Sequence, residues 1–81
     1  MKREYANNNA EYTALCKVIA RNLKRAIVNK GMTVTEFSER LGIGNSLFYR
    51  YARGEAIPTL YTAIKYCKEL GITLNDLVSE K

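Results

Sequence analysis

The sequence contains no histidine and only one aspartate, and its two cysteines, Cys16 and Cys67, lie fifty-one positions apart. Histidines and closely spaced cysteines are the usual zinc ligands, so we expect no metal site and no cofactor. Without histidine, and without a glycine-rich phosphate loop before a helix, no pair of nucleophile and base can be assembled, so we do not expect an enzyme. The cysteines are expected to be small core residues of a reduced, cytoplasmic protein.

Long apolar runs are missing as well. The longest are far too short to span a bilayer, so no membrane partner is expected. The amino terminus is polar and rich in asparagine, unlike a secretory signal. The length of 81 residues and the hydrophobic fraction of 47% fit one small globular domain. The formal charge of +5 favours a polyanion as partner, although solubility alone could also account for it.

The first third of the chain predicts a long helix over residues 11–30. Its apolar stripe repeats every four residues and consists of Leu15, Ile19, Leu23 and Ile27. Gly31 ends it. Residues 1–10 are polar and have no period, so we expect them to form a flexible tail before a folded domain over 11–81. Tyr5 and Tyr12 are candidates for packing against a partner.

The stretch 33–54 predicts two short helices on either side of a glycine-containing turn, as in a helix-turn-helix. Thr33 and Glu36 form a capping box that starts the first of them, and Gly42 ends it. The second is expected over about 45–52, with Phe48 and Tyr51 facing the core. The side left free carries Asn45, Ser46, Tyr49 and Arg50.

Two further helices complete an all-α domain of five. Thr59 caps a helix over 60–70, and Thr73 with Asp76 caps a short one over 74–78. The expected inward stripe of the fourth helix consists of Leu60, Ala63, Ile64, Cys67 and Leu70. Tyr61 and Tyr66 lie off that stripe and are expected to leave apolar surface exposed. The expected dimer seam consists of residues 66–78 together with the N-terminal segment.

The ordered set Gly-x-Thr, Leu-Gly-Ile, Arg-Gly-x-x-x-Pro-Thr and Leu-Gly-Ile-x-Leu, spread over residues 31–77, resembles the lambda repressor and Cro type helix-turn-helix proteins, the XRE family. The resemblance implies a compact five-helix DNA-binding domain with the helix-turn-helix at helices two and three. It further implies that the segment after Gly44 enters the major groove. Bases would be read by Asn45, Ser46 and Arg50, with Tyr49 nearby. The DNA backbone would be contacted by Gly44, Thr35, Arg53 and Thr59.

The chain departs from the family's pattern at three places. Val34 stands where many members carry glutamine, and its contact is lost or is taken over by Thr35. Gly44 stands where many carry a serine or threonine cap. Ile27 and Ala52 occupy the positions of an arginine and glutamate that often form a buried ion pair. Since an apolar pair can replace a buried ion pair at little cost, we expect Ile27 to pack near Ala52.

These observations predict a sequence-specific DNA-binding transcriptional regulator that represses by occupying an operator on double-stranded DNA. One recognition helix reads only a few base pairs, so a homodimer on two half-sites is expected. The alternative is a protein-interaction module that keeps the fold, such as an antitoxin with a protein partner.

Overall fold

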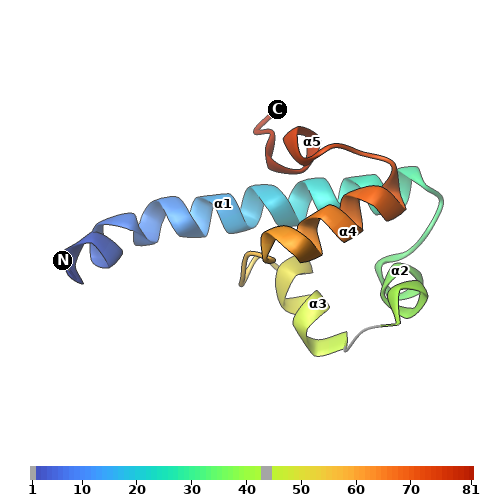
Figure 1. Cartoon of the computed structure of the whole chain (residues 1–81), viewed down its shortest axis with the longest axis horizontal. Coiled ribbons are helices and arrows are strands. Elements are labelled where there is room, and N and C mark those ends of the chain that lie inside the picture. The colour runs from blue at the N-terminus through green and yellow to red at the C-terminus, as the bar shows by residue number, and fades with distance from the viewer. Residues whose placement is uncertain (1, 43–44) are drawn as a thin grey trace.

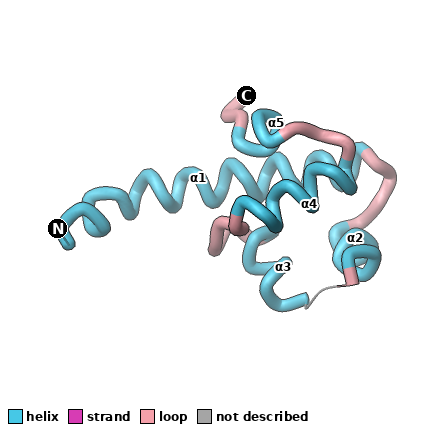
Figure 2. Tube along the Cα trace, in the orientation of Figure 1, coloured by secondary structure: helices cyan, strands magenta, loops and turns pink. Residues whose placement is uncertain are grey.

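The structure is a computed structural model that describes residues 2–42 and 45–81, with side chains described for 10–42 and 46–81. Its described residues form five helices and no strand (Figures 1 and 2). The helices are α1 (Lys2–Asn29), α2 (Val34–Leu41), α3 (Asn45–Ala52), α4 (Leu60–Leu70) and α5 (Leu74–Val78). The predicted all-α class and the bounds of the last four helices are thereby confirmed.

The long helix α1 is the central element, because α2, α3 and α5 all contact it. Figure 1 shows α5 on one side of α1 and the α2–α3 pair on the other. Its 28 residues, at about 1.5 Å each, account for the whole 42 Å long axis of the molecule. The amino-terminal part of α1 extends beyond the other helices (Figure 1).

The helix α1 begins at Lys2, earlier than the start near residue 11 that the apolar period predicts. No glycine or proline occurs before Gly31, so nothing in the sequence stops a helix from continuing towards the amino terminus. The apolar period marks only the part of the helix that is covered by the domain. That residues 1–10 behave as a flexible tail outside the domain stays a prediction.

The helix ends follow the predicted capping residues. Thr33 accepts a hydrogen bond from the Glu36 amide, and the Glu36 carboxylate accepts one from the Thr33 amide, at 3.1 and 2.9 Å. Thr73 and Asp76 make the same reciprocal pair at the start of α5. Gly42 ends α2 with a φ of 68°, a left-handed conformation that strains any residue with a Cβ. Capping therefore fixes where α2 starts and stops, and with it the start of the turn to α3.

An aromatic cluster joins α2, α3 and α4 in the core. The Tyr66 ring lies 5.9 Å from that of Phe37, 5.7 Å from that of Phe48 and 6.3 Å from that of Tyr51. Such edge-on packing is favoured by aromatic quadrupoles. The expectation that Tyr66 lies at the surface is wrong, since only 1% of it is exposed. The expectation that Leu60 faces the core is also wrong, since 66% of it is exposed.

Both errors have one cause, which is that α4 carries two overlapping apolar stripes. The stripe that starts at Leu60 has the regular spacing, but a second one, rotated around the helix, starts at Ala63. The buried members of the second stripe are Ala63, Tyr66, Cys67 and Leu70. The helix turns this stripe inward because it places the large Tyr66 ring in the space between Phe37 and Phe48.

Ile27 and Ala52, the apolar pair at the position of the family's ion pair, are both buried in the same core cluster. Ile27 is fully covered and Ala52 is 5% exposed. A charged side chain at only one of these two positions would be buried without a partner. Because both residues are apolar, no such charge is present. Helix α3 is thus attached to α1 through apolar packing.

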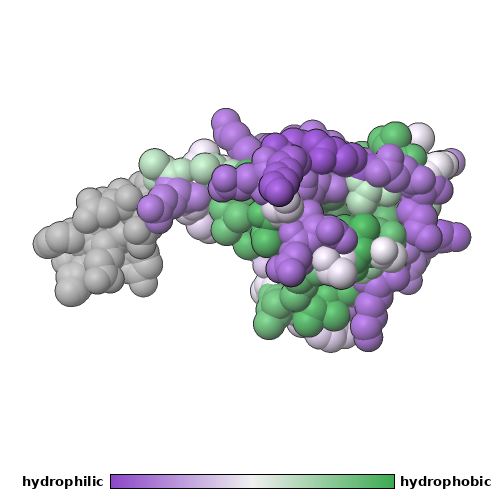
Figure 3. Space-filling view, turned by 90° about the horizontal axis from the view of Figure 1, so that it is seen from above, coloured by the Kyte–Doolittle hydropathy of each residue, from purple (hydrophilic) through white to green (hydrophobic). Residues whose placement is uncertain are grey.

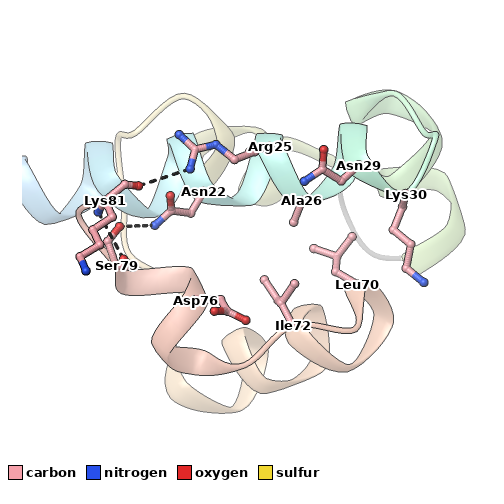
Figure 4. A pocket seen from close by; sticks show the side chains of 10 residues that line it. All are labelled: Asn22, Arg25, Ala26, Asn29, Lys30, Leu70, Ile72, Asp76, Ser79 and Lys81. Atoms are coloured by element: carbon pink, nitrogen blue, oxygen red, sulfur yellow. Dashed lines mark hydrogen bonds between the residues drawn. The ribbon is translucent and has the colours of Figure 1, made fainter.

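The carboxyl-terminal end is fastened to α1 by side chains on one face of that helix. The buried Asn22 amide donates to the carbonyl oxygens of Leu77 and Ser79 at 2.8 and 2.7 Å. Arg21 also donates to the Ser79 carbonyl, and Arg25 donates to that of Lys81. Figure 4 shows the contacts of Asn22 with Ser79 and of Arg25 with Lys81 at one end of a pocket of about 370 Å³ between α1 and α5. The polar groups at that end of the pocket therefore hold the chain's own terminus.

Among the described residues, no helix combines the length and the apolar character that crossing a bilayer requires.

Candidate nucleic-acid interface

Helix α3 has one face in the core and one in solvent. Its buried residues are Phe48, Tyr51 and Ala52. On the other side, Ser46, Arg50 and Arg53 are spaced by four and three positions and are all exposed, Arg53 lying directly after the helix. Residues at this spacing share one side of a helix. The structure thus brings three of the predicted DNA-contacting residues into one exposed row.

Arg50 lies in the middle of this row and makes no ion pair or side-chain hydrogen bond to any described residue. Leu47, beside it, is half exposed and adds an apolar contact surface next to the row. The backbone of Asn45 begins α3, but its side chain and the whole of Gly44 lie outside the described residues. Their predicted contacts with bases and backbone stay predictions.

Tyr49 connects α3 to α2. Its hydroxyl donates to the Thr35 hydroxyl over 3.1 Å, and its ring packs edge-on against Phe48 at 5.6 Å. Tyr49 is half-buried while Thr35 is exposed, so the pair bridges the two helices at the edge of the candidate interface. Tyr49 is predicted to lie near the bases and Thr35 to contact the DNA backbone, and the structure places their two side chains together.

Arg53 is engaged by an acidic neighbour. Its Nε and Nη2 donate to the two carboxylate oxygens of Glu55 at 2.8 and 3.1 Å, and both side chains are exposed. The hydrogen bonds to Glu55 raise the pKa of Arg53, and those to Arg53 lower the pKa of Glu55. Arg50 lowers the Glu55 pKa further through its charge. Glu55 therefore reduces the positive potential at the end of the exposed row.

Gly54 places this acidic loop. Its φ is 78°, and a Cβ on it would lie 3.6 Å from the Cys16 carbonyl oxygen and from Lys17 Cα of α1. The left-handed φ lets the chain turn sharply here and is reached most easily by a residue without a Cβ, whereas a Cβ at this distance would make only ordinary van der Waals contact with α1. The sequence predicts that Gly54 ends a helix. It does not predict the ion pair between Glu55 and Arg53, because that pair depends on the turn at Gly54.

Thr59 caps α4 with its side chain. Its hydroxyl oxygen accepts from the Thr62 amide at 3.2 Å, and it also contacts the Thr62 hydroxyl at 3.1 Å. One of the free backbone donors of the first turn of α4 is thereby satisfied, and the others remain available to an anion. Thr59 itself is exposed, as a backbone contact requires.

Comparison with protein families agrees with the helix-turn-helix arrangement of α2 and α3. A family model described as helix-turn-helix matches residues 23–77, more than half of the chain and all of α2, α3 and α4. No curated protein and no solved structure showed significant similarity to the chain. The chain belongs to the helix-turn-helix family of the lambda repressor and Cro type, the XRE family, whose members are DNA-binding regulators.

Proposed function

We propose that this protein is a sequence-specific transcriptional regulator that acts as a repressor by occupying an operator as a homodimer. The observation that carries the proposal is the exposed row of Ser46, Arg50 and Arg53 on a helix whose opposite face is fixed in the core by Phe48 and Tyr51. A helix held in this way can enter the major groove, which is wide enough to admit it.

The residues at the start and middle of α3 suit base recognition. Arg50 can donate two hydrogen bonds to O6 and N7 of guanine, and Asn45 can bond N6 and N7 of adenine. Each such pair contributes roughly 1 to 3 kcal/mol of discrimination against a wrong base. Ser46 can bond several bases and adds less selectivity. Tyr49 acts mainly by setting the angle between α2 and α3, because its hydroxyl is bonded to Thr35.

Contacts with phosphates would orient the domain on the duplex. Arg53, Thr35, the backbone at Gly44 and the amides at the start of α4 near Thr59 are the proposed donors. The free amides of a helix amino terminus are suited to phosphate. In this proposal Arg53 exchanges its bond with Glu55 for one with a phosphate when DNA binds.

A salt titration on random duplex DNA tests the proposal. The logarithm of the binding constant should fall linearly with the logarithm of salt concentration, with a slope of about −0.9 per phosphate neutralised. Duplexes selected from a random pool should then share a two-fold symmetric sequence. Arg50→Ala should relax the preference at one position of each half-site, whereas Arg53→Ala should weaken all duplexes by a similar factor.

A protein-interaction module, for example an antitoxin, is the second candidate. The pairing of Arg53 with Glu55 favours it, because this pairing reduces the charge available to DNA. Such a module would show almost no binding to random duplex at low salt. That result, obtained with a folded protein, would refute the proposed regulator.

A further inference from the structure

The pocket of about 370 Å³ lies between α1 and the segment that runs from the end of α4 through α5. Figure 3 looks down onto the side on which α5 lies and shows mostly hydrophilic surface there, with smaller hydrophobic areas among it. The volume is of the size that small organic ligands occupy. None of the residues proposed to contact DNA lines this pocket, and α2 and α3 lie on the other side of α1 (Figure 1). A ligand bound here would therefore be separate from the candidate nucleic-acid interface.

The floor of the pocket is apolar. Ala26 of α1, Leu70 of α4 and Ile72, which follows α4, point toward one another between the helices (Figure 4). Ala26 and Leu70 are buried and Ile72 is half-buried. This floor can cover the apolar part of a ligand, which is favourable because apolar surface is then removed from water.

The polar residues that line the pocket fall into two groups. Asn22 and Arg25 are engaged by the carbonyl oxygens at the end of the chain. Asn29, Lys30 and Asp76 line the pocket as well, and their side chains are exposed. The second group is therefore available to a ligand.

Lys30 and Asp76 carry opposite charges but make no ion pair with each other. In Figure 4 they lie on either side of Ile72. The Lys30 Nζ lies close to Gly71, since a Cβ on that glycine would be 3.9 Å from it. One carboxylate oxygen of Asp76 accepts from the Thr73 amide at 3.0 Å, and the other has no hydrogen bond to any described residue. The pocket thus presents one cation and one anion, held apart, to whatever enters it.

We propose that this pocket binds a small zwitterion with an apolar side chain, which is the chemistry of a free apolar amino acid. The ligand's carboxylate is bound by the ammonium of Lys30, and its ammonium donates to the free oxygen of Asp76. Its side chain lies on the floor formed by Ala26, Leu70 and Ile72. Both polar contacts are charge-assisted, which makes them stronger than hydrogen bonds between neutral groups.

The charges of the lining favour a zwitterion over a simple ion. A ligand with only a negative charge would have Asp76 near it without a matching donor. A ligand with only a positive charge would enter a pocket lined by three cations, Arg25, Lys30 and Lys81. Like charges repel at these distances, whereas a ligand that carries both charges can place each beside its opposite.

An NMR titration of the isotopically labelled protein tests the site, with L-phenylalanine and L-leucine as probes. The dissociation constant of at least one of them should be on the order of 1 mM, as expected for a ligand of this size. The amide signals of Lys30, Ile72 and Asp76 should shift during the titration. Those of Ser46 and Arg50 on α3 should stay in place.

Two analogues of phenylalanine serve as matched ligands. 3-Phenylpropanoate lacks the ammonium group, and 2-phenylethylamine lacks the carboxylate. Each keeps the aromatic ring that would lie on the apolar floor but loses one of the two charged contacts. Each should therefore bind at least about fivefold more weakly than phenylalanine.

Two variants test the residues. Lys30→Gln and Asp76→Asn each remove one charge from the pocket, and each should raise the dissociation constant for the amino acid at least about fivefold. Both side chains are exposed, and the amide introduced by Asp76→Asn can still accept from the Thr73 amide, so both variants should fold. Lys68→Gln and Glu69→Gln are the matched controls, because they make the same charge changes at exposed positions of α4 that do not line the pocket. They should leave the constant within about twofold of wild type.

Three results would overturn the proposal. Neither amino acid shifts the pocket signals at concentrations of about 10 mM. Either analogue binds as tightly as phenylalanine. Either pocket variant binds as tightly as its control. The inference does not rest on DNA binding, because the exposed row of α3 lies outside the pocket, so failure of the proposed regulator would leave it standing.

Discussion

Arg53 and Glu55 face each other across the turn that follows the recognition helix, and the guanidinium donates to both oxygens of the carboxylate. The residue best placed to bind a phosphate at this end of α3 is thus paired with an acid of its own chain. Both side chains are exposed, so the pair adds little to stability, as is usual for surface ion pairs. In the proposed function its consequence lies in DNA binding, where Glu55 would compete with phosphate for Arg53.

Glu55→Gln should therefore strengthen binding to random duplex DNA. It removes a negative charge near the DNA and releases Arg53, so the log–log salt slope should become steeper by about 0.9 and affinity at low salt should rise roughly threefold. Fluorescence anisotropy over a series of salt concentrations measures both. Glu69→Gln is the control, since it changes the net charge equally from an exposed position on α4. Equal gains for the two variants would show that net charge alone is responsible.

The Tyr49–Thr35 hydrogen bond should couple the orientation of α3 to that of α2. Thr35→Val and Tyr49→Phe each remove one hydroxyl, and each should lower the free energy of unfolding by about 0.5 to 1 kcal/mol, because the bond is partly exposed. A double-mutant cycle should give a coupling energy of about 0.5 kcal/mol or more. Strictly additive losses would mean that the bond contributes nothing in solution.

Tyr49→Phe should lose specific DNA binding more than non-specific binding, whereas Thr35→Val, which also removes a proposed phosphate donor, should weaken both. Base contacts depend on the angle of α3 in the groove, whereas phosphate contacts tolerate small shifts. For Tyr49→Phe, affinity for a selected duplex should fall roughly fivefold while that for random DNA changes by less than about twofold. Equal losses of the Tyr49→Phe variant on both duplexes would assign Tyr49 to the phosphate backbone alone.

Most of this fold could be predicted from local signals. Capping residues such as Thr33 and Thr73, and glycines such as Gly42, act within a few residues of themselves, so the bounds of α2, α4 and α5 follow directly from the sequence. The exposed and buried faces of α3 follow from the spacing of Phe48 and Tyr51. The resemblance to the family adds the DNA-reading role proposed for that exposed face.

What the sequence does not reveal depends on contacts between distant elements. The inward rotation of α4 is decided by rings on α2 and α3, so the burial of Tyr66 cannot be read from its own helix. The ion pair of Arg53 with Glu55 is a local exception, because it depends on the turn that the left-handed φ of Gly54 makes and not on a periodic pattern. The start of α1 also lacks a signal, because a helix that covers no core shows no apolar period.

Tyr66→Phe should stabilise the protein. The Tyr66 hydroxyl is buried and has no hydrogen-bond partner among the described residues, and a buried polar group without a partner costs about 1 to 3 kcal/mol. Phenylalanine keeps the ring contacts with Phe37 and Phe48 and removes that cost. The midpoint of thermal unfolding should rise by about 4 to 8 °C for each kcal/mol gained. A lower midpoint would show that the hydroxyl has a partner in solution.

The same hydroxyl should make the wild-type protein sensitive to alkali. Burial raises the pKa of Tyr66 to about 12, with a smaller contribution from Tyr51, whereas its ordinary value is 10.0. Between these two values the unfolded chain releases a proton that the folded chain retains. The free energy of unfolding therefore falls as pH rises through this window, by up to roughly 1.4 kcal/mol per pH unit, and this contribution is fully present below pH 10.

Other tyrosines and lysines also titrate in this range, so the Tyr66 contribution is measured as a difference from Tyr66→Phe. Urea unfolding at several pH values should show a nearly constant advantage of the phenylalanine variant up to about pH 9. The advantage should then widen by on the order of 2 kcal/mol as the pH approaches 12. Parallel curves for the two proteins would mean that Tyr66 ionises equally well folded and unfolded. The ring would then lie in contact with water, and the aromatic cluster that fixes α3 against α4 would be more open than the structure shows.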